Sequence, residues 1–365
     1  MNGIGFNKII LPRYVYTGPN VIKELPLIFH HLALSKGNIL LISGKGETAS
    51  ISNDSVKPLL ESEGIEAETM EIESMRNFVD NLPEMIHKVK DSDPKIILGV
   101  GGGKAIDSAK LLASITNKRL ISVPTNASHD GLSSPVISFV LNLYLRKKFD
   151  LKMELKAPVA IVADINFIKN CPKKSLVAGV GDLLAKKTAV KDWELAYMLR
   201  NEEYSEYAAS MALMSARLIE DNINEIAKFD ERSISIILKA LIGSGIGISV
   251  AGSSRPASGS EHLFSHALDI LSEEYGFKAE LHGIQVGIGT IVMSQLHGLN
   301  HKKIRDLLKK VGAATNAKEL GIDREYLIKA LMMSNKIRRD RYTILGDADI
   351  SYNAAEKLLK RAEVI

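Results

Sequence analysis

Between residues 38 and 140, short apolar runs alternate with amphipathic segments, and this alternation constrains the fold more than any other feature of the chain. The apolar runs are NILLIS, AETMEIE, KIILGV and RLISVPT, and the segments between them include LPEMIHKVKDS and KAIDSAKLLASI. Strands that alternate with helices in this way form parallel sheets covered by helices. We therefore predict an α/β, Rossmann-like N-terminal domain with a parallel sheet.

The pattern of predicted secondary structure changes after this region. SPVISFVLNLYLRKKFDLKMELK contains two β-rich runs around charged residues, which predicts an edge hairpin, and VAIVADI predicts a last strand. The segment EEYSEYAASMALMSARLIEDNINEIAKF then repeats apolar residues at helical spacing. Since 365 residues are too many for one typical core, we predict two domains, an α/β domain over residues 1–168 and an all-α domain over residues 169–365.

Composition limits the classes of function. Hydrophobic residues make up 45% of the chain and charged residues 25%, as in ordinary globular proteins. A net charge of +4 without a basic stripe argues against a nucleic-acid partner. The single cysteine, Cys171, fits a reducing compartment, and the first residues lack the layout of a signal peptide, so we expect a cytoplasmic location. The longest uncharged run, residues 240–254, is too short for a transmembrane segment and predicts a buried helix.

The segment KIILGVGGGKAIDSAK places three glycines between a strand and a helix. Gly101, Gly102 and Gly103 would let a ligand approach the backbone, and the helix N-terminus would attract a phosphate. This arrangement predicts a dinucleotide site, although a tight turn without a ligand would have the same composition. No carboxylate directly follows the strand NILLIS, and Lys45 lies nearby, so NADPH is as plausible a cofactor as NADH.

A second polar loop follows the strand RLISVPT, at the edge where open α/β sheets bind ligands. Its hydrogen-bonding residues are Thr125, Asn126, Ser128, His129, Asp130 and Ser134. Because Ser, Asn and Asp are also favoured in turns, a polar loop without a ligand is the alternative.

Three histidines and an aspartate are candidate metal ligands. His262 and His266 share one helix face, His282 follows them, and Asp182 comes at an apparent helix start where it could instead be an N-cap. Asp192 is a weaker candidate. The other histidines have no partner cluster and are predicted to be solvated: His30, His31, His87, His297 and His301.

The order of the motifs carries a family resemblance. GVGGGKAIDSAK, PTNASHDGLSSP, AGVGDLLAKKTAVKDWELA, RPASGSEHLFSHALD, LHGIQVGIGT and IRRDRYTIL follow one another along nearly the whole chain. In this order they resemble the archaeal-type sn-glycerol-1-phosphate dehydrogenases. That family is similar in fold to glycerol dehydrogenase, iron-type alcohol dehydrogenases and dehydroquinate synthase.

The resemblance implies a role for each matching position. Asp182, His262 and His282 would hold the metal, with His266 as a rival to His262. Asp130, Asp182 and His266 would contact substrate, and Asp130 and His266 would be catalytic. In addition to Gly101 and Gly102, which the glycine loop itself suggests, the resemblance implies that the cofactor is lined by Gly103, Lys104, Ala105, Ile106, Asp107, Thr125, Asn126, Ala127, Ser128 and Ser134.

The resemblance also implies an activity, the reversible reduction of dihydroxyacetone phosphate to sn-glycerol 1-phosphate for archaeal-type phospholipids. One Zn²⁺ per subunit and NADH or NADPH would be the cofactors. We also expect a homo-oligomer. The alternatives are a glycerol or polyol dehydrogenase, a dehydroquinate synthase-like lyase and a nucleotide-sensing protein without metal. Candidates for the substrate phosphate are Arg255, Lys186, Arg339 and Arg341.

Overall fold

The computed structural model describes residues 9–34, 38–149 and 154–365, and the chain divides into two compact units. The first unit contains residues up to 127 together with residues 131–171, and the second contains residues 128–130 and 172–365. The chain therefore passes from the α/β unit to the helical unit between Cys171 and Pro172. The short segment 128–130 follows a strand of the first unit but packs with the second.

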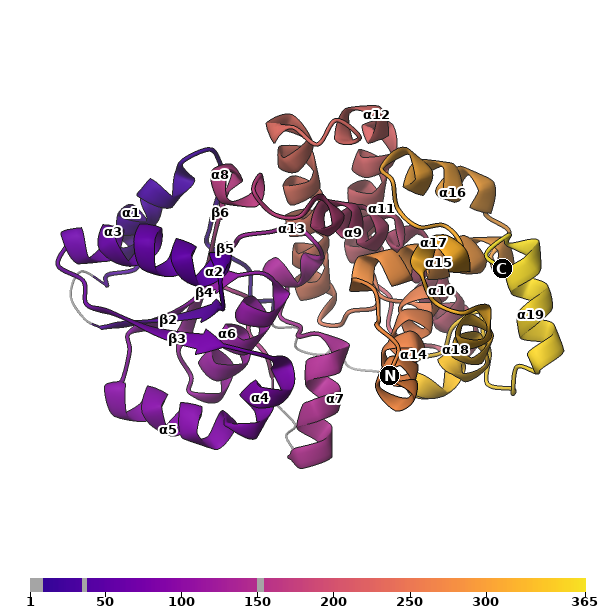
Figure 1. Cartoon of the computed structure of the whole chain (residues 1–365), viewed down its shortest axis with the longest axis horizontal. Coiled ribbons are helices and arrows are strands. Elements are labelled where there is room, and N and C mark those ends of the chain that lie inside the picture. Colours follow the sequence, from indigo (N-terminus) through magenta and orange to yellow (C-terminus); the bar gives the residue numbers. More distant parts are fainter. Residues whose placement is uncertain (1–8, 35–37, 150–153) are drawn as a thin grey trace, which may run out of the picture. The chain divides into compact units, whose positions relative to one another are not determined.

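A six-stranded parallel sheet forms the centre of the first unit, which confirms the predicted α/β class (Figure 1). The strand order is β1-β6-β5-β4-β2-β3. The strands are β1 Tyr14–Gly18, β2 Ile39–Gly44, β3 Ala67–Ile72, β4 Ile96–Gly101, β5 Arg119–Pro124 and β6 Ala160–Asp164.

Alternate residues of the central strands fill two separate cores. In β2, Ile39 and Leu41 pack with α1 and α3, whereas Leu40 and Ile42 pack with helices on the opposite face. Side chains alternate between faces in a strand, so an almost continuous apolar run is what a sheet covered on both faces requires. Figure 1 shows α1 and α3 on one side of the sheet and α5 on the other. The helical segments of this unit are η1 Val21–Glu24, α1 Leu25–His31, α2 Glu47–Ser50, η2 Ile51–Val56, α3 Lys57–Ser62, α4 Met75–Asp80, α5 Leu82–Ser92, α6 Gly103–Ile115, α7 Phe139–Lys148 and α8 Ile165–Ile168.

The predicted edge hairpin is wrong. Its first run is helix α7, and its second run has no strand at residues 154–158, while residues 150–153 lie outside the described part. Ser138 caps α7 by accepting a hydrogen bond from the Leu141 backbone N–H, and Leu141 and Leu145 are buried on one face. The i, i+4 spacing of these leucines fits a helix, and packing on that face outweighs the β propensity of the neighbouring residues.

The second unit contains only helices among its described elements, as the sequence predicts. A 3-10 turn, η3 Asp130–Leu132, begins in its short N-terminal segment. Its helices are α9 Lys173–Leu184, α10 Lys186–Arg200, α11 Glu206–Asp221, α12 Ile223–Ile226, α13 Glu231–Ala251, α14 Ser260–Tyr275, α15 His282–Leu296, α16 His301–Lys310, α17 Ala317–Leu320, α18 Arg324–Ile337 and α19 Tyr352–Arg361.

Helix α13 contains most of the uncharged run at residues 240–254. Within the described residues it is the one helix long and apolar enough to cross a membrane, and 61% of its most apolar window is buried. It packs against α11 and α9. At Gly247 an added Cβ would lie 3.5 Å from the Ala208 carbonyl oxygen of α11, so the helices are close there. These contacts agree with the buried helix predicted from the sequence.

Candidate functional site

The glycine loop of the first unit is formed by the backbone. Gly101 ends β4 with φ +147°, a conformation that L side chains rarely adopt, and Gly102 precedes α6. A Cβ added at Gly102 would lie 2.4 Å from Asn126 Nδ2, and the Thr125 N–H donates to the Gly101 carbonyl at 3.0 Å. The loop therefore lies directly against the polar loop after β5, and both follow parallel strands at the same sheet edge.

The remaining predicted cofactor residues differ in exposure. Lys104 is exposed, whereas Ala105, Ile106, Thr125, Ala127 and Ser134 are buried, and Gly103, Asn126 and Ser128 are partly buried. Asp107 is buried and faces inward, because its carboxylate accepts the Ser138 N–H at 2.8 Å and lies 3.5 Å from Lys110 Nζ. Lys110 also donates to the carbonyls of Gly131 and Val136. Asp107 and Lys110 thus fasten the loop after residue 130 to α6.

Two features fit a bound dinucleotide, one in the glycine loop and one in the polar loop after β5. The glycines add no side chain at the N-terminus of α6, where backbone N–H groups and the helix dipole favour a phosphate. The Ser134 hydroxyl is buried and has no hydrogen-bond partner among the described residues. Other buried serine hydroxyls share this property, but Ser134 lies in the polar loop after β5, where a ligand could supply the partner.

The three predicted metal ligands come together in the second unit. Asp182, His262 and His282 each offer an atom within 4.8 Å of the atoms offered by the other two. Asp182 is near the end of α9 and not at its start, so the N-cap alternative is wrong. His262 is in the first turn of α14, and His282 is the first residue of α15. Two imidazoles and one carboxylate are a donor set that catalytic zinc sites use.

Glycines allow the helices that carry these ligands to touch. A Cβ at Gly181, next to Asp182, would lie 2.1 Å from the Gly283 carbonyl oxygen, and a Cβ at Gly283 would lie 1.9 Å from the Ala178 carbonyl oxygen. Helices α9 and α15 therefore pack backbone against backbone, closer than any larger residue would permit. This contact sets Asp182 beside His282.

Neighbouring side chains orient both histidines. His262 Nδ1 lies 2.8 Å from Glu261 Oε1, which directs Nε2 toward Asp182 Oδ1 at 3.4 Å. His282 Nδ1 lies 3.2 Å from the Ser265 hydroxyl. Glu261 is fully buried and also accepts from Thr188 Oγ1 at 2.7 Å. Carboxylate and hydroxyl partners of this kind fix the orientation of ligating histidines.

The charges around the ligands favour a divalent cation. Asp130, Asp182 and Glu261 are buried carboxylates, and Lys186 is the buried ammonium beside them, 2.9 Å from Asp130 Oδ2 and 3.1 Å from Asp182 Oδ2. Burial alone would raise the pKa of Asp182, but Lys186 and then His262 lower it far below its usual range. With neutral histidines, this cluster carries two uncompensated negative charges, which are costly to bury without a counter-ion.

Protonation of the two histidines agrees with this assignment. Burial would lower the pKa of His262, but its hydrogen bonds to Asp182 and Glu261 raise it. Burial and the nearby His262 lower the pKa of His282 to about 3, so its imidazole is neutral. The two carboxylates thus favour a positive charge at His262, and a metal ion bound to Nε2 would supply that charge in place of a proton.

A second group of possible metal ligands also includes His282. Ligand atoms of His266, Asp269 and His282 also lie within 4.8 Å of one another. Burial raises the pKa of Asp269 to about 7, whereas Asp182 remains anionic. The pKa of His266 is lowered well below normal, first by burial and then by His282 and His262. Charge therefore favours Asp182, His262 and His282 as the ligands, with His266 beside them.

The structure corrects the prediction for His297. Its side chain is 6% exposed, and Nε2 lies 3.0 Å from Asp192 Oδ1. Asp192 also accepts the backbone N–H groups of Ser260 at 2.6 Å and Ile344 at 2.7 Å. Asp192 therefore fastens the start of α14. Of the other histidines predicted to be solvated, His30, His31 and His87 are exposed and His301 is partly buried.

Sequence reasoning missed Glu261 as part of this site. Adjacent helical residues do not usually face each other, so its contact with His262 has no spacing signal. The sequence suggests Lys186 as a phosphate ligand, but it pairs with Asp182, and their i, i+4 spacing is a usable sign of this ion pair.

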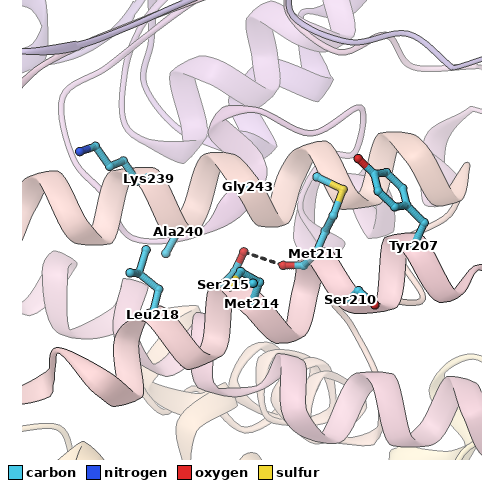
Figure 2. Close-up of a pocket in the computed structure, with 9 residues that line it drawn as sticks. All are labelled: Tyr207, Ser210, Met211, Met214, Ser215, Leu218, Lys239, Ala240 and Gly243. Carbon is cyan, nitrogen blue, oxygen red and sulfur yellow. Dashed lines mark hydrogen bonds between the residues drawn. The ribbon is translucent and has the colours of Figure 1, made fainter.

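Two surface pockets lie away from all of these residues. One, of about 320 Å³, is a groove between α11 and α13 (Figure 2). Figure 2 shows Met211 and Leu218 reaching from α11 toward α13, and the Ser215 hydroxyl donating to the Met211 carbonyl. The other, of about 360 Å³, is lined by Met70, Asn81, Glu84, Met85 and Lys88. Neither contains a predicted site residue.

Known proteins resemble this chain both in sequence and in fold. Residues 16–172 match the family model for iron-containing alcohol dehydrogenase. In fold, the chain is similar to glycerol dehydrogenase from Schizosaccharomyces pombe, with a TM-score of 0.77, 18% identity, and coverage of 98% of this chain and 90% of that one. A probable glycerol dehydrogenase from Sinorhizobium meliloti gives a TM-score of 0.74 at 19% identity, with 98% of each chain covered.

Relatives with higher identity bear the name glycerol-1-phosphate dehydrogenase (NAD(P)+). The protein from Korarchaeum cryptofilum is 50% identical over 287 residues, which are 79% of this chain and 91% of the relative. The protein from Methanosarcina mazei is 43% identical over 97% of this chain and 96% of its own. The protein from Pyrococcus horikoshii is 44% identical over 97% of this chain and 98% of its own. This chain belongs to the glycerol-1-phosphate dehydrogenase family.

Proposed function

We propose that this chain is an enzyme that reversibly reduces dihydroxyacetone phosphate to sn-glycerol 1-phosphate with NADH or NADPH. The observation that carries the proposal is the cluster of Asp182, His262 and His282 within a chain whose relatives are named for this reaction. The hydride would add to the ketone carbon, and a proton would complete the new hydroxyl. The product would enter archaeal-type phospholipid backbones.

Asp182, His262 and His282 would hold one metal ion per subunit, and zinc is the ion that this donor set suits. When bound, the ion supplies a Lewis acid that polarises the ketone, and the reduced nicotinamide supplies the hydride. Glu261 and Ser265 keep the ligand histidines in the orientation that this chemistry needs.

Neighbouring side chains hold the Asp130 carboxylate, which we propose contacts the substrate. Its Oδ2 accepts from the Ser244 hydroxyl at 2.7 Å and lies 2.9 Å from Lys186 Nζ, while its backbone N–H donates to Asp182. These contacts fix the carboxylate, so that it can accept a hydrogen bond from a substrate hydroxyl. We assign Asp130 to hold that hydroxyl.

His266 is the candidate for moving the proton. Its lowered pKa keeps the imidazole neutral, so it can accept a proton at one nitrogen while donating from the other. A neutral histidine beside the ligands can therefore pass a proton from solvent to the product without becoming a stable cation.

The glycine loop of the first unit would bind the cofactor pyrophosphate at the N-terminus of α6, with the residues predicted from the sequence around it. Lys45, which suggested NADPH, forms an exposed ion pair with Glu73 at 2.9 Å. This basic and acidic pair follows two neighbouring strands and is consistent with use of either cofactor.

We also propose a cytoplasmic homo-oligomer. Large apolar side chains are exposed on α10 and α11 of the helical unit, at Tyr197, Met198, Leu199, Tyr207 and Met214. Such side chains in one region are typical of surfaces that another chain covers. Light scattering coupled to gel filtration would give the number of subunits.

The test of the function is cofactor oxidation, followed by absorbance, with dihydroxyacetone phosphate as substrate. It is run on the purified protein, after chelation and after zinc is restored, with chiral analysis of the product. We expect turnover that depends on metal and gives the sn-1 phosphate. Formation of the sn-3 phosphate, or turnover only with unphosphorylated polyols, would contradict the proposal.

A further inference from the structure

Three arginines gather near the candidate catalytic histidine in the helical unit. Arg338 follows α18, the helix that packs against α14, and Arg341 lies three residues later. Both are near enough to His266 for their charges to lower its pKa. Arg255 is near enough to Arg341 to contribute to a lowered Arg341 pKa. Arg341 also donates to the Ser258 carbonyl, just before α14 begins, so the cluster of Arg255, Arg338 and Arg341 lies near the helix that carries His266.

The arginines differ in how far their donors are used. Arg255 is 3% exposed, and its Nε and both Nη atoms bind Glu202 and the Tyr342 carbonyl. Arg341 is 7% exposed and donates to the Ser258 carbonyl and the Ser254 hydroxyl, both uncharged. Arg255 is thus committed to a carboxylate, whereas Arg341 has no carboxylate in hydrogen-bond contact among the described residues.

Arg338 uses few of its donors within the described part of the chain. One Nη atom donates to Asp340 Oδ2 at 2.9 Å, and the side chain is 35% exposed. The three guanidiniums are accompanied by two carboxylates, Glu202 and Asp340. Burial and then Arg338 and Arg255 lower the pKa of Arg341 to about 9. A buried cation crowded by like charges is unfavourable without an anion beside it.

We infer that Arg338 and Arg341 form the subsite for the substrate phosphate. This inference rests on the proposed function and deepens it, because it assigns the residues that distinguish a phosphorylated ketone from a simple polyol. A guanidinium binds phosphate through two parallel N–H groups and stays charged at neutral pH. The other cations considered from the sequence are used elsewhere: Arg255 binds Glu202, Lys186 binds Asp130 and Asp182, and Arg339 is exposed near Asp349.

The test compares Arg338→Gln and Arg341→Lys with the matched control Arg339→Gln. Lysine keeps the charge of Arg341 but removes the two-pronged contact, and Arg338 is exposed enough for glutamine to be tolerated. We expect each variant to raise the KM for dihydroxyacetone phosphate by about 10- to 100-fold, the size expected for a lost charged hydrogen bond. The kcat should change less than the KM, and the control should match the unmodified enzyme.

Inorganic phosphate provides a readout that does not need activity. Phosphate should raise the melting temperature of the unmodified protein and of Arg339→Gln, and this rise should be lost in Arg338→Gln. An equal phosphate response in all variants, together with an unchanged KM, would overturn the subsite. If the unmodified enzyme did not reduce dihydroxyacetone phosphate, the proposed function would fail, while loss of the phosphate response in Arg338→Gln would still support an anion site.

Discussion

The glycine loop and the proposed metal centre are built in opposite ways. The loop is contiguous, since residues 101–107 run from the end of β4 into α6, and its important groups belong to the backbone. The proposed metal centre takes Asp182, His262 and His282 from three helices, and its important groups are side chains held by other side chains. The glycine loop requires the absence of side chains, whereas the proposed metal centre requires side chains from residues far apart in the sequence.

This difference determines how each site is damaged. A backbone site is sensitive to added atoms, because a single Cβ occupies the space of the ligand or of a neighbouring loop. A side-chain site is sensitive to removed charges and hydrogen bonds, including those one contact away from the ligand. The proposed metal centre shares one property with the loop, since α9 and α15 approach closely at Gly181 and Gly283.

The largest effect is expected for Asp182→Asn. Replacing the anionic ligand removes the charge that holds the ion, so activity should fall by about 10³-fold or more, equivalent to several kcal/mol. Metal content by mass spectrometry should fall with it, while NADH affinity should not change. Asp221→Asn, at an exposed position of α11, is the control. Full metal content with normal activity would show that Asp182 is not a ligand.

Gly283→Ala should have the next largest effect. The new Cβ would lie 1.9 Å from the Ala178 carbonyl oxygen, a backbone atom that has little freedom to move, so we expect a loss of about 3 kcal/mol in the free energy of unfolding. Gly287→Ala is the matched control on the same helix, because its Cβ would meet flexible Leu308 side-chain atoms at 3.4 Å and the Gly181 Cα at an ordinary 3.8 Å. Thermal unfolding of both variants would decide this, and equal melting temperatures would contradict the close packing of α9 and α15.

Glu261→Gln tests the hydrogen bond behind His262. Glutamine keeps the shape but removes the charge that orients the imidazole, so metal affinity should fall by about 10- to 100-fold. Competition with a coloured chelator would measure this, and Glu274→Gln, exposed on the same helix, is the control. An unchanged affinity would mean that Glu261 only fills a buried position.

The smallest effect is expected for Gly102→Ala in the other unit. The Cβ would lie 2.4 Å from Asn126 Nδ2, and since that amide can rotate away, we expect NADH to bind about tenfold more weakly, or about 1.4 kcal/mol. Metal content should be unchanged. Gly247→Ala, where the added atom makes ordinary contact at 3.5 Å, should leave NADH binding as it was. Loss of metal in Gly102→Ala would break the contrast between the two sites.

Features encoded by neighbouring residues could be predicted from the sequence. The strands beginning at Ile39, Ile96 and Arg119 and helix α5 follow from periodicity alone, and the glycine loop follows from its position between strand and helix. The meeting of Asp182 with His262 and His282 followed only from the family resemblance, because no local pattern joins residues so far apart.

Other features depend on packing that the sequence does not display. Helix α7 forms because Leu141 and Leu145 are buried against the first unit, which outweighs a β-rich composition. His297 is paired because α15 ends beside Asp192, a contact between residues 105 positions apart. The place of Asp182 late in α9 was also hidden, because the glycines around it suggest a helix start but serve close helix packing.

The most direct test of the account is the metal content of His262→Asn and His266→Asn, compared with the unmodified protein after chelation and zinc restoration. The two residues lie on the same helix, and each belongs to one of the two ligand groups that share His282. We predict one zinc per chain in the unmodified protein and in His266→Asn, and almost none in His262→Asn. Retention of zinc by His262→Asn and its loss from His266→Asn would place the ion with Asp269 and contradict the account.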